Sequence, residues 1–140
     1  MTRVFVCCFL FFLSAGTNFW AALKYPDIEP TIWGFITTGA FLISLFCLQR
    51  QKLVVLAAAG SLCTAFLFAT ESFRDSNMFL DLISNMLYPF YALFIMPLFG
   101  LQLLFSFPLA SFAGLCAGCY FILYILHLLL IWGSNKQAGL

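Results

Sequence analysis

Charged side chains are scarce in this sequence. The 140 residues include only six Lys and Arg and five Asp and Glu, while 64% of the residues are hydrophobic. A soluble domain usually has about 25% charged and about 45–50% apolar residues. So few charges cannot cover a water-facing surface, which excludes a soluble enzyme and a disordered regulator. The lack of a basic patch also excludes nucleic acid as a partner. The sequence therefore predicts an integral membrane protein whose surroundings are the lipid bilayer.

Motifs for catalysis and metal binding are also missing. The sequence has no P-loop, HExxH or GxSxG motif. Its single histidine, His127, has no second His or carboxylate near it in the sequence and makes a poor metal site. The long apolar runs contain no Asp, Glu, Lys or Arg, whereas proton relays and most ion-coupled transporters need ionisable groups inside the membrane. We expect no metal and no cofactor, and a non-enzymatic role is favoured.

Long apolar runs are abundant, and each approaches the roughly 20 residues that cross a bilayer as a helix. They cover residues 4–23, 31–48, 53–70, 82–105 and 109–132. The sequence thus predicts an all-α fold, a multi-pass transmembrane helical bundle with five spans in one domain of residues 1–140. The small residues 14–16 also resemble a signal-peptide cleavage site, and cleavage there would leave four spans.

The distribution of charge gives a weak orientation. Five spans put Arg3, the loop at 49–52 and the turn at 106–108 on one side, with the C-terminus on the other. Lys and Arg divide equally between the two sides, so the positive-inside rule does not favour either orientation. All acidic residues fall opposite Arg3, namely Asp27, Glu29, Glu71, Asp75 and Asp81. We expect a cytoplasmic N-terminus on this basis.

Small residues at helical spacing predict where helices approach closely, because apolar burial gives little attraction between helices in lipid. One ridge lies in the third run and one in the fifth; they consist of Ala57, Ser61, Ala65 and Ala69, and of Ala110, Gly114 and Gly118. Each ridge serves either packing within the chain or contact with a membrane-protein partner or a second copy. This pattern favours an accessory or structural subunit that acts through helix contacts.

A second hypothesis is a polar pocket between the fourth and fifth runs. If these runs form an antiparallel hairpin folded at Phe107, helical geometry brings several polar side chains to one level. The group comprises Asn85, Tyr88, Tyr124 and His127. Pro89 and Pro97 predict a kink in the fourth run, because each removes an amide donor. The pocket would suit transport or binding of a small ligand; interhelical hydrogen bonds alone are the structural alternative.

A third hypothesis concerns the CxxC motif formed by Cys116 and Cys119. The motif resembles that of membrane thiol oxidoreductases such as the vitamin K epoxide reductase family, which carry a CxxC in a helix of a small bundle. That resemblance implies intramembrane thiol redox chemistry. It covers these four residues alone, and no loop predicted opposite Arg3 contains the partner cysteines of that family. Packing by small, soft side chains is the structural alternative.

Overall fold

The computed structural model describes residues 2–48, 50–70, 78–105 and 107–138. All regular elements within these ranges are helical, which confirms the predicted all-α bundle. In chain order they are α1 (Thr2–Leu23), α2 (Ile32–Leu48), α3 (Gln51–Ala69), α5 (Met78–Phe90), the π-helical turn η1 (Tyr91–Ile95), the 3₁₀ segment η2 (Met96–Leu103) and α6 (Leu109–Ala138).

Four stretches are long and apolar enough to cross a membrane, judged by length and composition. They are Thr2–Leu23, Gln51–Ala69, Asp81–Leu103 and Leu109–Trp132, and the apolar helix Ile32–Leu48 is shorter at 17 residues. Large apolar side chains remain exposed on these helices, for example Phe5 on α1 and Ile43 on α2. Such an outer surface suits lipid rather than water, and the helices therefore indicate a membrane protein.

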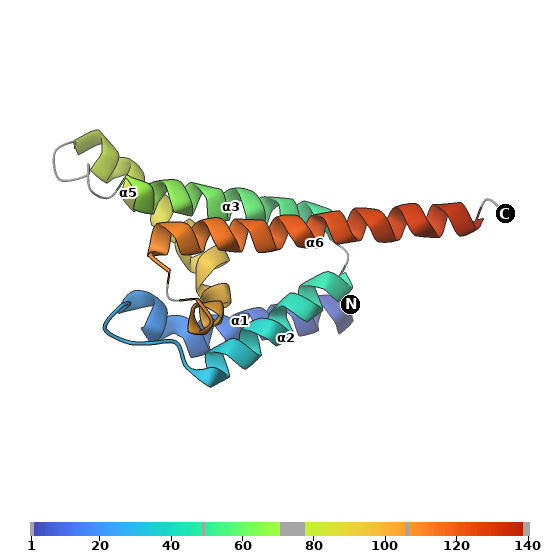
Figure 1. The fold of residues 1–140 in the computed structure, drawn as a ribbon, viewed down its shortest axis with the longest axis horizontal. Coiled ribbons are helices and arrows are strands. Elements are labelled where there is room, and N and C mark those ends of the chain that lie inside the picture. The colour runs from blue at the N-terminus through green and yellow to red at the C-terminus, as the bar shows by residue number, and fades with distance from the viewer. Residues whose placement is uncertain (1, 49, 71–77, 106, 139–140) are drawn as a thin grey trace.

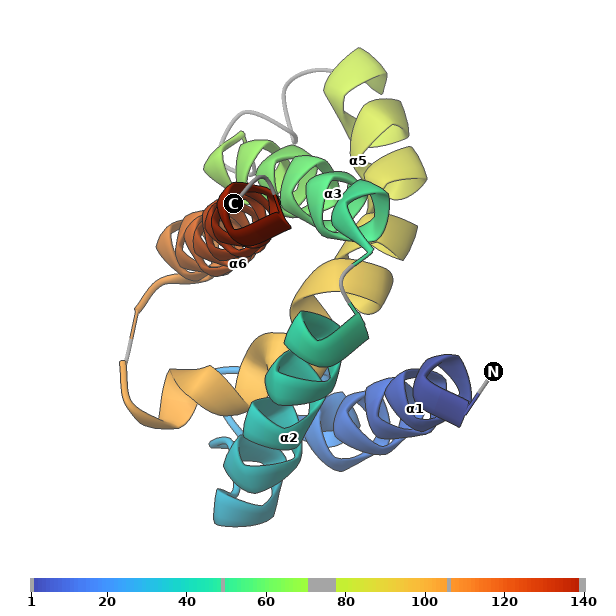
Figure 2. The ribbon, with the colours of Figure 1, turned by 90° about the vertical axis from the view of Figure 1, so that its right-hand side faces the viewer.

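The helices form two layers joined by the fourth apolar segment. The lower layer in Figure 1 contains α1 and α2, and the upper layer contains α3 and α6. Figure 2 shows the segment from α5 through η2 descending from the upper layer to the lower one. In agreement, α5 and η1 pack on α3, whereas η2 packs on α1 and α2.

Two prolines account for the irregular path of this segment. Pro89 lies in the last turn of α5, and Pro97 lies at the start of η2. Neither can donate a backbone hydrogen bond to the preceding turn, so the α-helical pattern is interrupted. The chain passes instead through a π turn and then a 3₁₀ segment. The kink predicted from the two prolines is confirmed.

The bend carries the chain back to the end of the bundle from which it came. Tyr91 donates from its hydroxyl to the carbonyl of Ala22 at 2.6 Å, at the end of α1. Farther along, the Tyr25 hydroxyl donates to the carbonyl of Phe107 at 3.4 Å. Residues on both sides of η2 therefore lie beside the α1–α2 loop. The sequence predicts the turn at 106–108 at the opposite end, with Arg3, whereas the structure places Phe107 of that turn beside the α1–α2 loop.

The direction of α6 follows from its contacts. Near its start, Phe112 packs edge-on against Phe99, which in turn contacts Tyr25 of the α1–α2 loop. In its second half, His127 stacks on Phe46, close to the end of α2. The start of α1 and the end of α6 consequently lie toward the same end of the bundle (Figure 1). Tyr120 and Phe112 on α6 contact Phe94 and Phe99 of the fourth run, but α5 packs on α3 instead, so the expected antiparallel hairpin of the fourth and fifth runs is formed only near its turn.

Glycines set the closest contacts between the layers and the bent segment. The Cα of Gly100 on η2 lies so close to the backbone of Gly34 on α2 that a side chain there would overlap it. In the same way, Gly60 on α3 accommodates the ring of Phe94 from η1. The missing side chains thus allow the segment to fit between α2 and α3, where Phe99 and Tyr91 are almost fully buried.

Candidate functional site

A buried polar cluster joins α1, α2 and η2. The hydroxyls of Ser14 and Thr38 both donate to the carbonyl of Pro97, at 2.6 and 2.9 Å. Asn18 donates from Nδ2 to Oγ1 of Thr38 at 3.1 Å. All three side chains are fully buried. The cluster binds a carbonyl at the interrupted helix, as expected where a proline break needs polar partners inside a membrane.

The cluster is closed rather than open to a ligand. Oγ of Ser14 and Oγ1 of Thr38 lie 3.2 Å apart, which leaves no room for an ion or a water between them. One atom, Oδ1 of Asn18, lacks a hydrogen-bond partner among the described residues and lies against Gly34. The arrangement therefore holds three helices together, which is the usual role of such hydrogen bonds between membrane helices.

The four residues of the expected polar pocket do not come together. Asn85 and Tyr88 are exposed on α5, and the Tyr88 ring lies 5.9 Å from that of Tyr91. Tyr91 in turn contacts Phe68, near the end of α3. Tyr124 instead borders a hollow lined by Gln51 and Lys52, at the start of α3. The pairs from α5 and α6 thus lie near opposite ends of the 19-residue α3.

His127 has a different partner from the one expected. It is 1% exposed, and its Nε2 donates to the backbone carbonyl of Phe46 at 2.8 Å. The two rings also stack, with centroids 5.3 Å apart. Its Nδ1 has no partner among the described residues. The histidine therefore ties the second half of α6 to the end of α2, and within the described residues no group of three metal-ligating side chains gathers.

The two cysteines of the CxxC motif lie in different surroundings. Cys116 is fully buried in the core, whereas Cys119, one turn later on α6, is partly exposed. Both thiols are free. Cys116 shares the core with Phe112 and Tyr120. Redox chemistry at this pair stays a prediction.

The two small-residue ridges face opposite ways. On α3, Ala57 and Ser61 are buried inside the bundle, Ala65 is partly buried and Ala69 is exposed. On α6, Gly114 and Gly118 are exposed, and a side chain at either would meet no described atom within 4 Å beyond its own helix backbone. The packed face of α6 instead presents other residues, namely Phe112, Ala113, Cys116, Ala117 and Tyr120. The α3 ridge thus serves packing within the chain.

The polar cluster of Ser14, Asn18 and Thr38 was missed from the sequence, although a signal was present. Ser14 and Asn18 are four residues apart and share one face of a helix, as do Gly34 and Thr38. A polar pair in one apolar run and a glycine–hydroxyl pair in the next predict a close, hydrogen-bonded crossing. The third partner, the carbonyl of Pro97, has no side-chain signal because it belongs to the backbone.

Comparisons with known proteins add no information about this geometry. No protein-family model, no curated protein and no solved structure matches the chain.

Proposed function

We propose that this chain is a small, non-enzymatic subunit of a membrane assembly, which binds another transmembrane helix through Gly114 and Gly118 on α6. The open face at these two glycines is the observation that carries the proposal. The partner helix belongs to another membrane protein or to a second copy of this chain.

The two glycines form a GxxxG pair, which lets two helix backbones approach closely enough for favourable contacts in lipid. Elsewhere in the bundle, glycines at close contacts are already filled: Gly60 faces Phe94 and Gly100 faces Gly34. Gly114 and Gly118 also lack a side chain, but no described residue of another helix fills the space beside them. Their face is therefore available for a partner that lies outside this chain.

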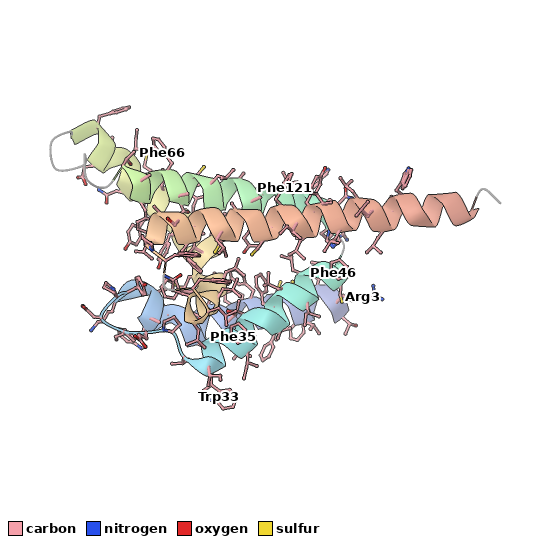
Figure 3. All side chains as sticks on the ribbon, in the orientation of Figure 1. Arg3, Trp33, Phe35, Phe46, Phe66 and Phe121 are labelled. Atoms are coloured by element: carbon pink, nitrogen blue, oxygen red, sulfur yellow. The ribbon has the colours of Figure 1, made fainter. Side chains whose placement is uncertain are left out.

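The surroundings of the pair suit a helix rather than a small polar ligand. Ser111 precedes Gly114 by three residues and is also exposed. On the other side, Phe121 and Ile122 are more than half exposed on α6 (Figure 3). Two exposed glycines with large apolar side chains beyond them let the backbone of an apolar helix approach closely at that point.

Substitution of both glycines tests the proposal. G114L and G118L together place large side chains on this open face, and we expect the abundance of the proposed assembly, measured by native mass spectrometry after gentle extraction, to fall about tenfold or more. The matched control is G16L on α1, which makes the same change at an exposed glycine with equally open surroundings. Helix content measured by circular dichroism should be the same in all three proteins.

Two results would contradict this role. The assembly could persist unchanged in the double variant, or the wild-type protein could remain a monomer in every mild extraction. The mass of the assembly also distinguishes a second copy from a different partner.

The two other hypotheses have less geometric support. A ligand pocket needs Asn85 and Tyr88 to meet Tyr124 and His127, which lie near opposite ends of α3. Thiol redox chemistry needs access to Cys116, which is fully buried. We therefore place both below the helix-contact role.

A further inference from the structure

An apolar cleft lies between the two layers, at the end of the bundle that contains Arg3. It encloses about 330 Å³ and is lined from five elements: α1, α2, α3, η1 and α6. Phe41 and Leu45 form part of its floor and are buried, whereas Phe12 and Leu56 at its edge are more than half exposed. The cleft is therefore open to the surroundings of the bundle instead of being sealed within it.

The lining is suited to a hydrocarbon chain. Apart from two cysteine thiols and the hydroxyl of Tyr120, every lining side chain is aliphatic or aromatic. The Tyr120 hydroxyl already donates to the carbonyl of Phe94 at 3.0 Å. A polar ligand would thus find no charged group in the cleft to bind, while an alkyl chain would find apolar contacts and give up no hydrogen bonds on entering.

Cationic side chains surround the same end of the bundle. One hollow of about 430 Å³ is bordered by Arg3 and Arg50, and a second of about 650 Å³ by Arg50 and Lys52. Both hollows share Val4 and Leu48 with the apolar cleft. The three cations therefore lie where the cleft ends, and all three are exposed.

The described carboxylates lie at the other end. Asp27 and Glu29 belong to the loop between α1 and α2, and Asp81 lies in the first turn of α5. In Figure 1 these elements are at the left, while Arg3 is labelled at the right in Figure 3, which has the same orientation. The positive charge around the cleft is consequently not neutralised by the described acidic residues.

We propose that this end of the bundle binds an anionic phospholipid of the surrounding bilayer. One acyl chain occupies the apolar cleft, and the phosphate of the headgroup lies among Arg3, Arg50 and Lys52. Both halves of the ligand are specified by adjacent features of the protein, an apolar cleft and a cationic rim. The proposal does not depend on the helix-contact role of α6, because Gly114 and Gly118 line neither the cleft nor the cationic hollows.

The test uses the full chain in nanodiscs containing equal amounts of phosphatidylglycerol and phosphatidylcholine with identical acyl chains. Lipids that remain bound after release into the gas phase are counted by native mass spectrometry. We expect the wild type to retain phosphatidylglycerol preferentially. Each basic residue near a membrane surface contributes about fivefold to the attraction of an anionic lipid, so R3Q, R50Q and K52Q should each reduce the preference by about that factor.

Two matched controls separate this site from general effects. K24Q removes a cation from the α1–α2 loop, at the opposite end, and should leave the preference unchanged. C8F places a ring in the cleft and should reduce all lipid retention several-fold, whereas C63F makes the same change at an exposed cysteine on α3 outside the lining.

Equal retention of the two lipids by the wild type would overturn the proposal. So would a preference that survives the combined R3Q, R50Q and K52Q changes, or one that K24Q lowers as strongly. If C8F and C63F have equal effects, the acyl chain does not occupy the cleft. A partner protein bound at this end in place of lipid would also refute it.

Discussion

Single side chains decide how the interrupted helix is held in an apolar environment. A carbonyl buried in hydrocarbon without a hydrogen bond costs several kcal/mol, on the order of the cost of any unsatisfied backbone group in a membrane. Here Ser14 and Thr38, from two different helices, both donate to Pro97. Two hydroxyls that donate to one carbonyl thus hold together α1, α2 and η2, which are distant from one another in the sequence.

Removing one of these hydroxyls should destabilise the bundle. T38V keeps the side-chain shape but loses the donor to Pro97 and the acceptor for Asn18. We expect the free energy of unfolding to fall by about 0.6 kcal/mol, the average for an interhelical hydrogen bond in a membrane protein, and by no more than about 1.7 kcal/mol per bond lost. The measurement is unfolding in mixed detergent micelles, followed by circular dichroism.

The control is T64V. Thr64 is equally buried, but its hydroxyl donates to Gly60 in the same helix, at 2.9 Å, and joins no other helix among the described residues. Its loss should change stability far less. Equal destabilisation by T38V and T64V would mean that the cluster contributes nothing beyond an ordinary buried hydroxyl.

At the scale of elements, the contact between η2 and α2 depends on the absence of a side chain at Gly100. Gly100 lies against the backbone of Gly34, which cannot move without displacing α2. G100A should therefore destabilise the protein by about 1–3 kcal/mol, the usual cost of overpacking a well-packed core. Unfolding in mixed micelles measures this difference.

G39A is the matched comparison on α2. A side chain at Gly39 would meet no described atom within 4 Å beyond its own helix backbone. Alanine there should be neutral or slightly stabilising, because it restricts the unfolded chain. If G100A behaves like G39A, η2 does not approach α2 as closely as described.

The elements also show that the sequence predicts the helix boundaries well but does not predict how each segment runs through the bundle. Apolar runs end at charged and turn-forming residues, so the predicted runs 4–23 and 31–48 agree closely with Thr2–Leu23 and Ile32–Leu48. Run length alone does not determine a path through the bundle. Pro89 and Pro97 predict a kink, but the direction of the bend depends on Gly34 and on buried hydroxyls in other helices.

Because the sequence does not determine the path of each segment, it also does not determine which candidate residues lie together. Placing Tyr88 level with Tyr124 depended on a hairpin between the fourth and fifth runs, and once the fourth segment turns back, that register no longer holds. Gly114 and Gly118 were found as a motif, but the side of α6 that packs inward is decided by the bulky residues Phe112 and Tyr120. A motif predicts close approach without naming the partner.

At the scale of the whole molecule, the return of the fourth segment changes the expected topology. The start of α1 and the end of α6 lie toward the same end, together with the end of α2 and the start of α3. Four of the six basic residues belong to these parts of the chain: Arg3, Arg50, Lys52 and Lys136. By the positive-inside rule, an excess of Lys and Arg marks the cytoplasmic side, so we expect both termini in the cytoplasm.

Labelling of single cysteines tests this topology in sealed membrane vesicles. In a chain whose six native cysteines are replaced by alanine, T2C and Q137C should react with a membrane-impermeant maleimide from the cytoplasmic side. E29C, in the loop between α1 and α2, should react only from the other side. If T2C and Q137C are labelled from opposite sides, the fourth segment crosses the membrane fully and the five-span arrangement holds. The end bearing Arg3 would then lack the end of α6, which supplies none of the three cations Arg3, Arg50 and Lys52 around the cleft.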